Sequence, residues 1–75
     1  MKKKDLYYNY IGQQQEKEIV QALNDGYAVN VGSSCIGHTR AQMVNDNAKR
    51  IFQTAGAKLA FTEYTPYGSF HYYML

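Results

Sequence analysis

The sequence of 75 residues contains one cysteine, one proline and no tryptophan. A single cysteine cannot form a disulfide within the chain, and a lone thiol fits a reducing compartment better than a secreted scaffold. We therefore expect a cytoplasmic protein whose hydrophobic core holds the fold without a covalent cross-link. The chain also lacks any apolar run approaching the roughly 20 residues that cross a bilayer, so no contact with a membrane is expected.

Charge of either sign is scarce as well. Eight basic and six acidic residues give a net charge of +2, and three of the basic residues are Lys2, Lys3 and Lys4. We interpret residues 1–4 as a basic N-terminal tail that precedes a single domain over residues 5–75. Without this tail the domain is nearly neutral, which favours a protein partner over nucleic acid because phosphate binding needs clustered basic side chains.

Aromatic residues, in contrast, are abundant, with eight tyrosines and three phenylalanines. Tyrosine combines an apolar ring with a polar hydroxyl group, so it suits half-buried surfaces and interfaces. The composition therefore favours a binding surface built from tyrosine side chains.

The hydrophobic periodicity predicts four strands and two helices. The strands are expected at residues 5–11, 27–31, 58–64 and 69–74, and the helices at 13–24 and 41–55. Thr39 and Gln42 have the spacing of a capping box at the start of the second helix, and Gly56 marks its end. Because right-handed crossovers place both helices on one side of the sheet, we predict an α+β two-layer sandwich in the order β-α-β-α-β-β, with a four-stranded mixed sheet.

This order of elements is similar to that of three known families: the sulfur-carrier proteins, the Alba chromatin proteins and the C-terminal domain of bacterial initiation factor three. The resemblance is one of topology and implies a fold rather than a function. Gly12 and Gln13 stand where the sulfur carriers have a Cys-Pro pair, so the resemblance does not imply sulfur relay.

The sheet face away from the helices is the first candidate site. If Leu59, Phe61, Phe70 and Tyr72 point toward the helices together with Val29 and Val31, strand alternation leaves a second set pointing outward. That second set contains Lys58, Thr62, Tyr64, His71 and Tyr73. The sequence thus predicts a non-enzymatic module that binds a protein partner through this open face. The partner is another protein or a second copy of the chain, and small accessory inhibitors made by bacteriophages act in this way.

The segment between the second strand and the second helix is another candidate. It resembles the phosphate-binding loop G-x-x-x-x-G-K-[ST] with His38 in the place of the lysine. Its candidate anion-binding residues are Gly32, Ser33, Ser34, Gly37, His38, Thr39 and Arg40, since backbone N–H groups at a helix N-terminus attract anions. Binding of phosphate, a nucleotide or RNA here is the alternative function, and an ordinary turn made of small residues is the structural alternative.

Cys35 lies inside this segment and suggests a thiol enzyme. However, four residues separate it from Arg40, where phosphotyrosine phosphatases have five, and most single cysteines act as small hydrophobic residues. We therefore expect no catalytic residues, no cofactor and no metal site.

Overall fold

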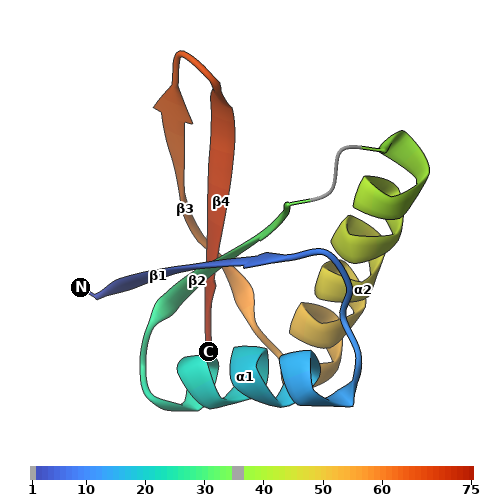
Figure 1. Ribbon diagram of the computed structural model, residues 1–75. Helices are drawn as coiled ribbons and strands as arrows, with labels where there is room; N and C mark the ends of the chain where they lie inside the picture. The colour runs from blue at the N-terminus through green and yellow to red at the C-terminus, as the bar shows by residue number, and fades with distance from the viewer. Residues whose placement is uncertain (1, 35–36) are drawn as a thin grey trace.

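Six elements follow one another in the predicted order in the computed structural model, which describes residues 2–34 and 37–75 (Figure 1). They are β1 (Lys3–Tyr8), α1 (Gln13–Asn24), β2 (Ala28–Ser33), α2 (His38–Ala55), β3 (Lys58–Thr65) and β4 (Gly68–Met74). The predicted fold class, an α+β sandwich with one four-stranded mixed sheet, is confirmed.

The strand order in the sheet is β1-β2-β4-β3. β1 and β2 are parallel, β2 and β4 are antiparallel, and β3 and β4 form an antiparallel hairpin. The parallel pair needs a crossover, which α1 supplies. The hairpin therefore joins the sheet through β4, and β1 and β3 form its two edges.

Both helices pack on the face of the sheet that carries Val29. The buried side chains of α1 and α2 make the core with those of β2 and of the β1–α1 connection: Ile11, Ile19, Ala22, Leu23, Val29, Val44, Ala48, Ile51 and Phe52. In α2 these residues recur at helical spacing, as predicted. Gly56 ends this helix with a positive φ of 77°, a conformation that glycine adopts without steric cost.

The ends of two elements differ from the prediction. β1 begins at Lys3, so Lys3 and Lys4 belong to the sheet and not to a basic tail. The predicted capping box at the start of α2 is wrong, because Gly37 is the N-cap residue and Thr39 lies inside the helix. The amide of Gln42 donates instead to the carboxylate of Asp46, one turn further along. A flexible glycine before the helix thus replaces a side-chain cap.

The predicted orientation of β4 is also wrong. Tyr73 pairs with Val29 on the helix side of the sheet, and its ring stacks on Phe52 of α2 at a centroid distance of 4.3 Å. Because side chains alternate along a strand, Phe70 and Tyr72 lie on the open face. The expectation that Tyr73 points outward and Tyr72 inward is therefore reversed.

A bulge in β3 explains why Leu59 and Phe61 do not share a face. The register shifts between these two residues, so that Leu59 pairs with Tyr73 and Phe61 pairs with Tyr72. An extra residue in one strand of an antiparallel pair inverts the alternation beyond it. Lys58 precedes the bulge and pairs with Met74, which places it on the opposite side of the hairpin from Thr62 and Tyr64.

Candidate functional site

The outer part of the β3–β4 hairpin, residues 62–71, projects from the body of the molecule (Figure 1), and we call it the arm. β4 pairs with β2 at its C-terminal end, where Tyr73 lies opposite Val29, whereas β3 and β4 pair along their whole lengths. The backbone of the arm is thus paired between its own two strands. At its end Tyr64 is 83% and Tyr67 97% exposed.

The turn at the end of the arm is closed by a threonine. The hydroxyl group of Thr65 accepts a hydrogen bond from the N–H of Tyr67 at 3.1 Å and donates one to the carbonyl oxygen of Gly68 at 2.9 Å. Gly68 has a positive φ of 137°, which only glycine adopts readily. These contacts fix the backbone of the turn at Tyr67, whose side chain is exposed.

The structure brings four of the five predicted partner-binding residues together, but on the helix side of the hairpin. Thr62, Tyr64, His71 and Tyr73 share this side, and Thr62 Oγ1 lies 3.0 Å from Nδ1 of His71. Lys58 is on the other side because of the bulge. The prediction that these residues point to the open face holds for Lys58 and is wrong for the other four, which lie on the helix side.

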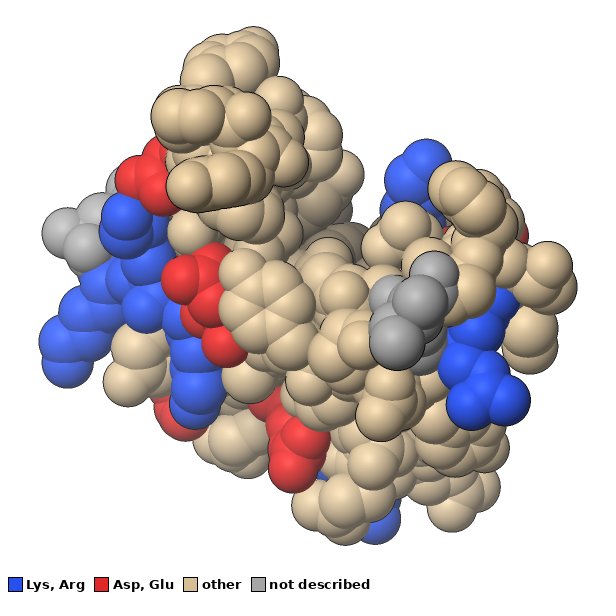
Figure 2. Space-filling view, turned by 45° about the horizontal axis from the view of Figure 1, so that its top comes forward, with Lys and Arg blue, Asp and Glu red and all other residues tan. Residues whose placement is uncertain are grey.

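A hollow of about 110 Å³ lies at the base of the arm, between β4 and α2. Figure 2 shows the molecule notched between the hairpin and the part that carries α2. The hollow is lined by Asn30, Val31, Asn45, Ala48, Lys49, Phe52, His71 and Tyr73. Its floor is apolar and contains the stacked rings of Phe52 and Tyr73, and its rim carries the polar side chains of Asn45, Lys49 and His71. We call this feature the arm–helix hollow.

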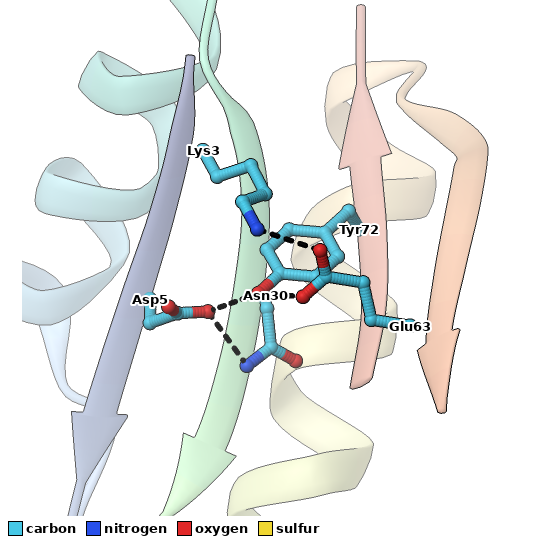
Figure 3. A network of polar contacts seen from close by, with 5 residues as sticks. All are labelled: Lys3, Asp5, Asn30, Glu63 and Tyr72. Atoms are coloured by element: carbon cyan, nitrogen blue, oxygen red, sulfur yellow. Dashed lines mark hydrogen bonds and ion pairs between the residues drawn. The ribbon is translucent and has the colours of Figure 1, made fainter. Parts of the chain in front are cut away.

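The middle of the open face is covered by a polar network (Figure 3). Lys3 and Glu63, from the two edge strands, form an ion pair of 2.6 Å, and the Lys3 ammonium lies 5.6 Å from the centre of the Tyr72 ring. Beneath this pair the Tyr72 hydroxyl donates to Asp5 at 2.7 Å, and Asn30 donates to the same carboxylate oxygen at 3.3 Å.

This network leaves Tyr72 only 2% exposed. Burial, and then the hydrogen bond to the Asp5 carboxylate, raises the pKa of Tyr72 far above its usual value. A phenol of this kind keeps its proton at neutral pH, so it acts as a hydrogen-bond donor and not as a base. Phe61 stacks on its ring at 4.7 Å. The centre of the open face is thus closed by side chains of the chain itself.

The predicted anion-binding segment is divided between two elements. Gly32 and Ser33 belong to β2, and the N–H of Ser34 donates to the carbonyl oxygen of Tyr8, which continues the pairing with β1. A Cβ atom at position 32 would lie 2.8 Å from the ring of Tyr7. The glycine therefore allows this ring to lie against the strand, a role unrelated to anions.

The remaining residues of that segment lie at the start of α2. Gly37 is the N-cap residue, and His38, Thr39 and Arg40 are exposed in the first turn. Cys35 lies outside the described residues, so the hypothesis of a thiol enzyme stays a prediction. Within residues 2–34 and 37–75, no cluster of three His, Cys, Asp or Glu side chains has the geometry of a metal site. No helix in this described part has the length and apolar character needed to span a membrane.

Two parts of the site were not predicted. Asn30 is 6% exposed within an apolar strand, and a polar residue in such a place signals a hydrogen-bonded partner. The presence of Asn30 in this strand could have indicated a hydrogen-bonded partner, although not that the partner is Asp5. Asn45 and Lys49 of the arm–helix hollow carry no comparable signal, because polar residues on the exposed side of a helix are common.

Comparisons with protein-family models, with curated proteins and with solved structures found no match for this chain.

Proposed function

We propose that this chain is a non-enzymatic interaction module that binds a protein partner through its arm. The observation that carries the proposal is the exposure of Tyr64 and Tyr67, at 83% and 97%, on a hairpin with a defined turn. Tyrosine is enriched at the centres of protein interfaces, where it buries a large area at a small cost in side-chain entropy. A preformed turn lowers the ordering cost further.

The charge of the hairpin favours protein over nucleic acid. Between residues 58 and 74 the charged side chains are Lys58 and Glu63, and Glu63 is already paired with Lys3. A hairpin that enters a nucleic-acid groove needs several basic side chains to neutralise phosphates. A nearly neutral, tyrosine-bearing hairpin fits a protein surface better.

Site-specific photo-crosslinking in cells of the source organism tests the proposal. A benzophenone amino acid replaces Tyr67 in one variant and Tyr10, which is 69% exposed in the β1–α1 connection, in the control variant. We expect a discrete adduct from position 67 that persists after nuclease treatment and is absent from position 10. Light scattering of the purified chain shows whether the partner is a second copy.

Two results would contradict the proposal. The first is that position 67 forms no adduct beyond those of position 10. The second is an adduct that disappears with nuclease, which would support the alternative of nucleic-acid binding.

A further inference from the structure

The arm–helix hollow offers a more specific contact than the tip of the arm. We propose that it receives one apolar side chain of the protein partner and that Lys49 at its rim pairs with a carboxylate beside that side chain. This inference rests on the proposed function, because it names the chemistry of the partner segment that the base of the arm binds.

The size and lining of the hollow match a single side chain. Its volume is about 110 Å³; because an enclosed apolar cavity that holds a benzene molecule measures roughly 150 Å³, this hollow takes a branched side chain or part of a ring. Phe52 and Tyr73 supply the floor, and Val31 and Ala48 add aliphatic surface. A ring or branched side chain that enters from the open side removes its own apolar surface and that of the floor from water.

The charge at the rim favours a carboxylate. No acidic residue is among those that line the hollow, and Lys49 forms no ion pair with any residue that the structure describes. The nearest acidic residue along α2, Asp46, accepts a hydrogen bond from Gln42. Glu63 faces the other side of the sheet, where Lys3 neutralises it. The rim therefore presents an ammonium group that is not in ion-pair contact with any carboxylate that the structure describes.

The polar groups beside Lys49 suit a carboxylate better than a phosphate. A phosphate site gathers several donors, as a nest of backbone N–H groups or a pair of arginines. Here Lys49 supplies one ammonium group, and Asn45 and His71 line the same hollow. One lysine matches a single negative charge.

Two dipeptides of equal shape test this inference on the full chain. N-acetyl-Phe-Asp-amide and N-acetyl-Phe-Asn-amide are titrated at millimolar concentration while amide chemical shifts are followed by NMR. We expect shifts around Val31, Ala48, Phe52 and Tyr73, and affinity about twofold to fivefold higher for the aspartate peptide, the upper range for one exposed ion pair.

Three variants separate the contributions. Lys49→Met should give both peptides the same affinity, and Asn45→Phe should abolish both titrations by filling the hollow from its rim. Lys17→Met, an exposed lysine on α1, should behave as the wild type. Shifts elsewhere in the molecule, equal affinities in the wild type, or tighter binding of thymidine monophosphate would overturn the inference.

The same variants distinguish this inference from the proposed function. If Asn45→Phe leaves the adduct at position 67 unchanged, the hollow is not part of the interface, although the arm still is. If position 67 forms no adduct in the wild type, the proposed function fails whatever the peptides do.

Discussion

The hydroxyl group of Tyr72 gives the most direct test of the network on the open face. It donates to Asp5 at 2.7 Å and lies 3.5 Å from Glu63, beneath the ion pair of Lys3 and Glu63. Tyr72→Phe removes this donor and keeps the ring that stacks on Phe61. The substitution therefore changes one hydrogen bond that joins β4 to the edge strand β1, with little change in packing.

The expected loss follows from the charge and exposure of the acceptor. A hydrogen bond to a charged group contributes about 1.5–3 kcal/mol. Asp5 is exposed and keeps its bond from Asn30, so water can replace part of the lost interaction. We expect the free energy of unfolding to fall by about 1.5 kcal/mol, the lower end of that range, which lowers Tm by about 6–12 °C in a domain of this size.

Urea unfolding followed by circular dichroism measures this change. If the slope of the free energy of unfolding against urea concentration is unchanged, the surface exposed on unfolding is the same in both proteins. Tyr10→Phe is the matched control, because Tyr10 is 69% exposed and should lose less than about 0.5 kcal/mol, as surface substitutions do. A loss from Tyr72→Phe as small as that of the control would refute the structural role assigned to the network.

Two further predictions concern pH and packing. Burial, and then hydrogen bonds to Glu18 and Asp5, raises the pKa values of Tyr8 and Tyr72 above the usual value near 10. Above pH 10 these phenols lose their protons in the unfolded chain before they do so in the folded protein, so the free energy of unfolding should fall as the pH rises further. In Tyr72→Phe this fall should be less steep by about 1.4 kcal/mol per pH unit, because one of the two groups is absent. Equal slopes in alkaline urea titrations would contradict this. Gly32→Ala should destabilise the protein by about 1 kcal/mol because its Cβ would lie 2.8 Å from the ring of Tyr7, and the same change should be neutral or stabilising in a Tyr7→Ser background. A thermal-melting cycle of the four proteins checks this, and equal losses in both backgrounds would argue against it.

The helices were the most predictable part of the fold. Val44, Ala48 and Ile51 lie on one side of any helix built from this segment, so their spacing identifies the buried side before any tertiary contact is known. Gly56 at the end of α2 was found for a similar reason, because helix termination depends on the local backbone. The start of α2 was not predicted correctly. Thr39 and Gln42 have the spacing of a capping box, but the helix begins two residues earlier, with Gly37 as its N-cap residue.

The candidate site was only partly predictable. The sequence alone placed Lys58, Thr62, Tyr64, His71 and Tyr73 on a common side of a hairpin, because they belong to two strands joined by a recognisable turn. The bulge in β3 separates Lys58 from the other four. It did not predict the hollow, because Lys49 and Tyr73 are far apart in the chain and meet only when α2 packs on the sheet. The ion pair of Lys3 and Glu63 joins residues 60 positions apart, and nothing local in either segment identifies the other.

By itself, the sequence determined the order of the elements, the buried sides of the helices and the positions of the turns, all of which follow from residues within a few positions of one another. The tertiary structure decided which side of β3 and of β4 meets the helices, whereas Val29 and Val31 of β2 face them as predicted. Period-two alternation fits either side equally well, and in this protein the choice depends on the stacking of Tyr73 on Phe52 and on the bulge between Leu59 and Phe61. These contacts between distant segments place Tyr72 in the covered network of the open face and Tyr73 in the floor of the arm–helix hollow.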